Sequence, residues 1–462
     1  MKTGSMSLNR SIIVAFVFVL GVTNSQAQTD AEWTLERCIS YAIENNIQIK
    51  QSALQQESAR LDKTQSLAQM FPNLNASGGF NMNFGRNIDP GTNAFVNEQV
   101  NSNNWRVGSN VTLFNGLRLL NSFKQSQLDL IAAEYDVQGL GNDISMNIAT
   151  AFMQVMFNEE LLLVAQDQFD ITSEQLARTV KLVDAGSLPE GMAFDVEAQL
   201  ASNELQVINM ENALSASVLA LKQMLNLQAS ESFRIKRPDS DVPMEELGTT
   251  TVGTVYDHAL NNWPQIKARE TRLESARKSE QIAFASYTPT LSASGSVSTF
   301  FSSSFEDIDF TTFERTPIPY GDQMERNLSE SVGLSLSVPI FNGLQSRTAV
   351  KKARLGRMNA ELQLQDQKNQ LYSSVQQAYN DAQAAKRQYD ASDKSVNATE
   401  KAFEYAEQRY EVGMMNTLEF NTSSNNVARS RSELLRSKYD YIFKMKVLDF
   451  YQGKPITFDP TK

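Results

Sequence analysis

Four segments of the chain alternate apolar and polar residues with a period of two, the pattern of β-strands that have one apolar and one polar face. The positions between the apolar residues are mostly Asn, Ser, Thr and Gly. Each run is about 10 to 12 residues long, close to the roughly 9–11 that a tilted membrane-spanning strand requires. The apolar positions are Leu74, Ala76, Gly78, Phe80, Met82 and Phe84; Trp105, Val107, Val111 and Leu113; Leu291, Ala293, Val297 and Phe301; and Val332, Leu334, Leu336, Val338 and Ile340.

The alternation has two interpretations. A soluble antiparallel sheet packed on a core alternates in the same way, and the pattern alone does not decide between it and a membrane barrel. The composition of the polar face favours the barrel, because Asn, Ser, Thr and Gly suit a water-filled lumen. The aromatic residues at the loop-side ends also favour it, since an interfacial girdle has them there: Phe80, Phe84, Trp105, Phe300 and Phe301.

Four strands are too few for a closed barrel. Single-chain barrels begin at about eight strands, and an open sheet edge in lipid leaves backbone groups unsatisfied at several kcal/mol each. We therefore expect several copies of the chain to share one barrel. Its hairpins are expected at 73–115 and 290–342, and the strand residues expected to face the lumen include Asn75, Asn81, Asn110, Ser294 and Ser335.

Long helices follow the hairpins. Seventy residues separate Gly116 from Gly186 and also Gly343 from Gly413, which is on the order of 100 Å if each helix is continuous. The apolar faces are narrow and rich in small residues, as in a coiled-coil-like wall. Gly139 is expected, together with Gly141, to interrupt the first long helix by a close helix approach or a local kink.

The chain is expected to reverse at Gly186 and Gly413, because Gly suits a helix C-terminus. Pro189 suits the first turn of the next helix, and Asn416 or Thr417 suits a helix N-cap. Return helices are expected over 192–227 and 418–451, and a Pro-containing linker over 238–248.

The whole arrangement occurs twice. The stretch from Val111 to Leu117 matches the stretch from Val338 to Leu344, and both contain Phe-Asn-Gly at a strand-to-helix junction. The spacing between matched residues is ten residues larger after the second hairpin than before it, which places an insertion in that hairpin. We predict two tandem repeats, 28–230 and 250–451, and a C-terminal tail over 452–462.

Residues 1–27 have the features of a secretory signal peptide: Lys2 and Arg10, an apolar run from Ile12 to Leu20, and a small-x-small end at Ala27. The alternative is a buried core strand. We expect no later segment to qualify as a candidate for a transmembrane helix. The formal net charge of −11 argues against nucleic-acid binding, which requires a basic face. The single cysteine, Cys38, lies on the apolar face of a helical run and is expected to pack in a core.

No catalytic constellation is found in the sequence. It contains neither a Gly-rich phosphate loop nor a Cys/His cluster. The single histidine, His258, is expected to be structural. The sequence therefore predicts no cofactor, no bound metal and no enzymatic activity.

The order helix, strand, loop, strand, long helix, tight turn and return helix, performed twice, resembles the TolC family of outer-membrane efflux proteins. The resemblance is carried by the two Phe-Asn-Gly junctions, the helix-to-strand switches at Pro72 and Pro289, and the turns at Gly186 and Gly413. It implies an α+β membrane protein: a homotrimeric twelve-stranded β-barrel in outer-membrane lipid, continued by a periplasmic α-helical barrel and equatorial region formed by 28–72, 116–289 and 343–451.

The same resemblance implies a passive export channel that receives cargo from an inner-membrane pump through a periplasmic adaptor. The rival hypothesis is a periplasmic coiled-coil scaffold or adaptor with a soluble β domain. The cargo, whether drug, metal or polypeptide, stays open.

Acidic residues just past each turn are the gate candidates that the resemblance suggests: Glu190, Asp195 and Glu419. The second-repeat match of Asp195 is Thr422, so the acidic pattern is incomplete. The alternative is a solvated face whose acids favour a helix N-terminus. The turn residues are candidates for the adaptor contact, with ordinary loop variation as the alternative: Gly186, Ser187, Leu188, Gly413, Met414 and Met415.

Overall fold

The computed structural model describes residues 32–88, 93–97, 99–228, 230, 232–237, 248, 250–309, 311–312 and 314–458. The expected signal peptide at 1–27 and most of the expected linker lie outside the described residues. The helices are α1 (Leu35–Asn45), α2 (Ile47–Ala68), α3 (Arg118–Asp184), α4 (Gly191–Met224), α5 (Val252–Asn262), α6 (Pro264–Phe284), α7 (Tyr320–Arg326), α8 (Gln345–Glu411) and α9 (Thr417–Tyr451). The strands are β1 (Asn75–Asn83), β2 (Arg86–Ile88), β3 (Phe95–Asn97), β4 (Val100–Phe114), β5 (Thr290–Ser302), β6 (Glu306–Ile308), β7 (Arg315–Pro317) and β8 (Ser329–Ser337).

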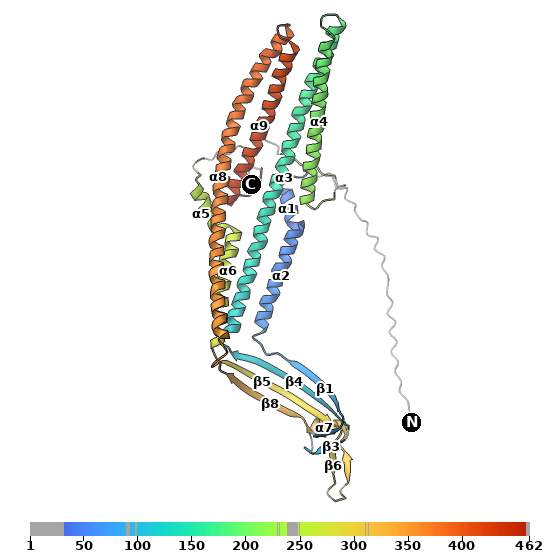
Figure 1. The fold of residues 1–462 in the computed structure, drawn as a ribbon, viewed down its shortest axis with the longest axis vertical. Coiled ribbons are helices and arrows are strands. Elements are labelled where there is room, and N and C mark those ends of the chain that lie inside the picture. The colour runs from blue at the N-terminus through green and yellow to red at the C-terminus, as the bar shows by residue number, and fades with distance from the viewer. Residues whose placement is uncertain are drawn as a thin grey trace, which may run out of the picture.

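The molecule is elongated, with a sheet at one end and a layer of long helices running away from it (Figure 1). Helices α3 and α8 are each 67 residues long, about 100 Å at 1.5 Å per residue. The expected break at Gly139 and Gly141 is absent, because α3 continues through both. The side chain of Gln265 on α6 lies only 3.0 Å from where a Cβ on Gly139 would be. Gly139 therefore permits a close helix approach without a kink.

The four long strands form one antiparallel sheet in the order β1-β4-β5-β8. The expected strands are thus confirmed. The central pair, β4 and β5, joins the two hairpins, while β1 and β8 are the edges. The short pairs β2/β3 and β6/β7, together with α7, lie at the end of the sheet away from the long helices (Figure 1).

Both strand-to-helix junctions have the same backbone. Gly116 and Leu117 have φ values of 66° and 65°, and Gly343 and Leu344 have 60° and 66°. A Cβ on residue 116 would overlap the hydroxyl oxygen of Thr288, so no residue other than glycine fits there. The fourth strand ends earlier than expected, at Ser337, because the chain then reaches Val338-Pro339 and proline has no N–H for the ladder.

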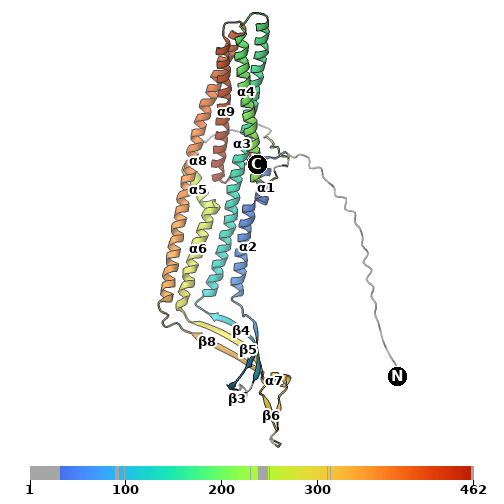
Figure 2. The ribbon, with the colours of Figure 1, turned by 45° about the vertical axis from the view of Figure 1, so that its right-hand side comes forward.

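The helices form a wall in which α3 packs on α2 and α6, and α6 packs on α8. In the half farther from the sheet, α4 packs on α3, α3 on α9, and α9 on α8. Figure 2 shows that this layer is continuous along the long axis of the molecule. Edge positions near the sheet therefore belong to α2 and α8.

The main apolar core lies about midway along the helices. Leu35, Cys38, Phe152 and Leu221, from α1, α3 and α4, are at most 2% exposed and belong to one cluster. The helical segment before Pro72 consists of two helices, since Asn46 ends α1 and caps α2 by accepting the backbone N–H of Gln48. The described part of the tail reaches the same core. The ring of Phe458 lies 6.1 Å from that of Phe152.

One stretch of α3 is long and apolar enough, by length and composition alone, to cross a membrane. The expectation that no segment after the signal peptide would qualify as a transmembrane-helix candidate was therefore wrong. Close to half of the stretch is buried inside the protein. The buried residues of α3 include Ile148, Phe152 and Val155 of the main core, which explains the apolar composition without a membrane.

Candidate functional site

The polar face of the sheet brings together the five strand residues expected to line a lumen. In the register, Asn110 pairs with Ser294, and Ser335 pairs with Ser292. Asn75 pairs with Gly108, which lies on the same face as Asn110, and Asn81 lies six residues further along the same face of β1. The five side chains therefore share one face, which is built mainly from Asn, Ser, Thr and Gly.

The opposite face is apolar and uncovered over most of the sheet. Leu291 pairs with Leu336, Ala293 with Leu334, and Gly295 with Val332. Val332 is 92% exposed, and Leu334 and Leu336 are also exposed. Large apolar side chains standing in a row on a solvent-accessible face mark a lipid or protein interaction surface.

Helix α7 covers the end of the apolar face that lies farthest from the long helices. The ring of Tyr320 lies 5.1 Å from that of Phe301, and the Thr299 hydroxyl donates to the carbonyl of Met324 at 2.7 Å. Phe300 points to the other face and contacts Phe305. Phe300 and Phe301 thus contact other parts of the chain on opposite faces. Only Phe301 shares the apolar face with Phe80 and Trp105, so Phe300 does not belong to the expected girdle.

The two turns at the far ends of α3 and α8 have the same hydrogen-bond pattern. At the first, Ser187 N–H donates to Leu182 C=O at 2.8 Å, and Gly186 has φ 71°. At the second, Met414 N–H donates to Arg409 C=O at 2.8 Å, and Gly413 has φ 75°. This is the Schellman pattern, in which glycine adopts the left-handed conformation that ends a helix.

The side chains of the turns differ in exposure. Met414 is 72% exposed and Ser187 is exposed, whereas Leu188 and Met415 are half-buried. The tips therefore present a small apolar and polar surface in which Met414 is the most accessible large side chain. The six residues expected at the adaptor contact form two separate tips of this kind.

The three acidic gate candidates lie near the starts of the return helices. Glu190 directly precedes α4, Asp195 lies in its second turn, and Glu419 lies in the first turn of α9; all three are exposed. No hydrogen bond or ion pair joins them to one another among the described residues. Glu419 is engaged locally, since Asn416 accepts its backbone N–H at 2.8 Å and donates its own amide to the Glu419 carboxylate at 3.1 Å. Asn416 is thus confirmed as the cap.

Sequence reasoning missed an aromatic contact at the second turn. The ring of Phe420 lies 4.5 Å from that of Tyr410 and 5.5 Å from that of Phe403. Phe403 and Tyr410 are seven residues apart on α8, a helical spacing that could have indicated the contact. The corresponding positions of the first repeat, Val183 and Ala193 among them, are not aromatic.

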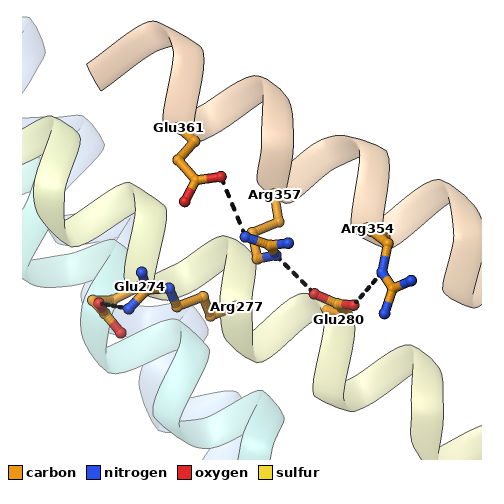
Figure 3. A network of polar contacts seen from close by, with 6 residues as sticks. All are labelled: Glu274, Arg277, Glu280, Arg354, Arg357 and Glu361. Carbon is orange, nitrogen blue, oxygen red and sulfur yellow. Dashed lines mark hydrogen bonds and ion pairs between the residues drawn. The ribbon is translucent and has the colours of Figure 1, made fainter. Parts of the chain in front are cut away.

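A second missed feature is the ion-pair network that joins α6 to α8 near the sheet (Figure 3). Glu280 accepts Nε–H of Arg357 at 2.9 Å and of Arg354 at 3.2 Å, and Arg357 also contacts Glu361 at 3.3 Å. Burial tends to raise the pKa of Glu280, but the hydrogen bonds and charges of Arg354 and Arg357 outweigh it and hold the pKa below its usual value. The network therefore holds a charged carboxylate between the two helices.

The described residues offer no group of three or more His, Cys, Asp or Glu side chains placed to hold a metal ion. Cys38 is fully buried, and burial raises the pKa of its thiol to about 12, so it stays a protonated packing residue, as expected. His258 lies against Gly453 and within 3.5 Å of the Tyr451 carbonyl. These contacts are those of a packing residue between α5 and the end of α9.

Comparison with solved structures shows that the chain shares its fold with chains of outer-membrane channels. The chain superimposes on a crystal structure of CusC with a TM-score of 0.75 at 17% identity, covering 91% of this chain and 92% of that one. For VceC of Vibrio cholerae the TM-score is 0.72 at 15% identity, and the match covers 90% of this chain and 94% of that one. For the open state of MtrE of Neisseria gonorrhoeae the TM-score is 0.68 at 19% identity, and the match covers 91% of this chain and 88% of that one.

The family follows from the sequence match. The model of the outer membrane efflux protein family matches residues 38–227 and 255–450, and the chain belongs to that family. Membership places the protein in the outer membrane, with the long helices as its periplasmic extension, and does not favour the rival scaffold hypothesis. The chain is also 19% identical over 252 residues to the proteases secretion protein PrtF of Dickeya chrysanthemi, a match that covers 53% of this chain and 50% of that protein.

Proposed function

We propose that the protein is a passive export duct across the outer membrane and periplasm, that it works as a homotrimer, and that it has no enzymatic activity. The observation that carries the proposal is a sheet with two open edges, one polar face and one apolar face. The same chain continues that sheet into a helical wall that also has two unpartnered edges.

The sheet edges supply the first argument for assembly. Each edge strand, β1 and β8, has nine residues, so roughly half of its backbone N–H and C=O groups point away from the sheet. In lipid each such group costs several kcal/mol. Because the four strands alternate in direction, β1 and β8 run antiparallel to each other. Copies joined edge to edge therefore continue an antiparallel ladder.

The helical wall supplies the second argument. On α2, Ile47, Leu54 and Leu61 are spaced by seven residues and are between 59% and 70% exposed. On α8, Leu355 and Leu362 have the same spacing and are similarly exposed. At about 1.5 Å per residue, Leu61 and Leu54 lie about 10 and 21 Å from the sheet-side end of α2. Leu355 and Leu362 lie about 15 and 26 Å from the start of α8. The two apolar stripes overlap in height, as a coiled-coil contact between copies requires.

Three copies give twelve strands, an even number within the range of bacterial barrels. Eight strands, from two copies, would leave an interior that side chains fill, which does not suit a duct. In the trimer the polar face with Asn110 and Ser294 lines the lumen, and the face with Val332 and Leu334 contacts lipid. The two predicted tandem repeats then alternate around the wall.

The far ends of the helices are the proposed docking site for a periplasmic adaptor, through which an inner-membrane pump delivers cargo. At the tips Ser187 and Met414 are exposed and Leu188 and Met415 are half-buried, and Glu190, Asp195 and Glu419 lie just beyond them. Three copies of these acids near the axis would favour cations at the entrance. The similarity to PrtF, a protease secretion protein, keeps polypeptides among the cargo classes.

Membrane fractionation combined with planar bilayer recording tests the proposal. We expect an outer-membrane protein that migrates as a trimer until heated and forms discrete conductance steps. A monomer in the soluble periplasmic fraction, or a trimer that forms no channels in bilayers, would overturn it.

A further inference from the structure

One side chain breaks the uncharged composition of the polar sheet face. Across β1, β4, β5 and β8 that face consists of Asn, Ser, Thr and Gly with a few apolar residues at its ends, and Arg106 is its single charged residue. The next cross-strand row carries Glu330, which pairs with Val297 and so lies on the apolar face. Charges of opposite sign are thus sorted onto opposite faces of the sheet.

Arg106 has small uncharged neighbours on its own face. It pairs with Ser77 on β1 and Ser298 on β5. Its Nε lies 3.8 Å from where a Cβ on Gly108 would be, which shows that the side chain extends along the polar face over that glycine. No carboxylate forms an ion pair with Arg106 in the part of the chain that the structure describes, and the residue is exposed. Its charge therefore acts on whatever fills the space in front of this face.

We propose that Arg106 forms a ring of three guanidinium groups that makes the barrel lumen selective for anions. The inference rests on the proposed trimer, because threefold symmetry places the three copies at one height whatever the strand tilt. A guanidinium keeps its charge at every physiological pH, and its fork of donors matches carboxylate and phosphate oxygens. Fixed charges of one sign on a pore wall raise the local concentration of the opposite ion.

The ring has the opposite sign to the acidic candidates at the periplasmic tips. Anionic solutes, such as carboxylates, phosphates and acidic polypeptide segments, are thus favoured in the barrel. Because the lumen is wet, salt weakens the effect: the screening length falls from about 10 Å at 0.1 M to about 3 Å at 1 M. A strong salt dependence separates a field in the lumen from a change in pore shape.

Reversal potentials in a potassium chloride gradient test the ring in the full-length channel. We expect Arg106→Gln to lower the chloride-to-potassium permeability ratio at least about threefold near 0.1 M salt, and far less at 1 M. Glu330→Gln is the matched control, since it changes one charge in the neighbouring row on the other face and should leave the ratio unchanged. An unaltered ratio in Arg106→Gln overturns the inference but not the duct. A wild type that forms no channels overturns the duct.

Thiol labelling gives a second, independent readout. The buried Cys38 leaves the wild type unreactive, so Arg106→Cys has one accessible thiol. Its thiolate attacks a methanethiosulfonate reagent, forms a mixed disulfide and releases methanesulfinate. A trimethylammonium-ethyl reagent should restore anion preference, and a sulfonatoethyl reagent should reverse it. Val107→Cys, on the apolar face, should show neither change. Reaction at Val107→Cys with a change in selectivity, or none at Arg106→Cys, would overturn the assignment of faces.

Discussion

The ring of Phe420 at the start of α9 stacks on that of Tyr410 near the end of α8, with centroids 4.5 Å apart and planes 20° apart. Phe420 is also buried. The contact holds α8 and α9 together at the second turn, where Gly413 has no side chain that could do so. The first turn has no corresponding pair, so the two tips differ in how firmly they are held.

Phe420→Ala should loosen the second turn. Removing a buried ring typically costs about 3–5 kcal/mol, and here most of that loss falls on the local closure of α8 on α9. Limited proteolysis should then cut near 412–416 faster than in the wild type. Leu418→Ala, which truncates an exposed residue of the same helix turn, should leave the cutting rate unchanged. Equal rates in all three proteins would show that the stacking does not hold the turn.

Glu419→Gln should raise single-channel conductance or weaken block by divalent cations. The expectation follows from the proposed ring of acids, whose mutual repulsion and field would act on ions at the entrance. Glu411→Gln is the control, because Glu411 is an exposed acid on the other side of the same turn. If conductance and block are both unchanged in Glu419→Gln, Glu419 does not belong to the gate.

Met414→Asp should abolish capture of the adaptor in a pull-down. A carboxylate replaces the most accessible apolar side chain of the tip, and a desolvated charge without a partner is unfavourable in an interface. Asn397→Asp adds a charge on the exposed surface of α8, well away from the tip, and should retain binding. Full retention by Met414→Asp would remove the second tip from the contact.

Leu54→Glu should weaken the trimer. A carboxylate at this position would be buried in the proposed α2–α8 contact between copies, at a cost of several kcal/mol. We expect heat dissociation of the trimer on gels at a lower temperature. Gln55→Glu introduces the same group one position away, outside the apolar stripe, and should have little effect. A Leu54→Glu trimer as heat-resistant as the wild type would argue against the stripe as an interface.

Acid should weaken the joint between α6 and α8. The pKa of Glu280 is lowered in the folded protein, so its contribution is present above the ordinary value of 4.5 and is lost as the pH falls through the lower folded value. Glu280→Gln should therefore lower the free energy of unfolding at neutral pH by about 1 kcal/mol or less, because the network is solvent-accessible, and a thermal melt should show a lower Tm. The difference from the wild type should shrink as the pH falls below the ordinary value of 4.5. Glu361→Gln, which contacts Arg357 alone, should have the smaller effect. A difference that is independent of pH would contradict the assignment.

Local sequence signals were sufficient for the four long strands, the long and return helices, and the turns between them. They did not indicate the short pairs β2/β3 and β6/β7 or helix α7. The period-two alternation gave the four strands, and the paired Phe-Asn-Gly and glycine signals gave the junctions and turns. These features depend on neighbours in sequence, such as the left-handed backbone at Gly116, and no distant residue was needed to locate them. The insertion expected in the second hairpin also agrees with the position of α7, for which the described residues of the first hairpin have no counterpart.

Contacts between distant segments could not be read from the sequence in this way. The strand order that places β4 beside β5 and the packing of Tyr320 on Phe301 depend on tertiary placement. The ion pairs of Glu280 with Arg354 and Arg357 also depend on tertiary placement, since more than 70 residues separate the partners. Gly139 shows the difference clearly: the sequence left open a close helix approach or a local kink, and the position of Gln265 on α6 decides for the close approach.

The equal length of α3 and α8 has a geometric consequence for the end of the molecule farthest from the sheet. Both helices start from the same junction backbone and run for 67 residues. Each added residue in one helix would advance its tip by about 1.5 Å and rotate it by about 100°. Matched lengths therefore keep the two tips level and in phase, so that the wall ends in an even rim. A single-residue deletion in either helix would tilt that rim and turn one tip away from any ring-shaped partner.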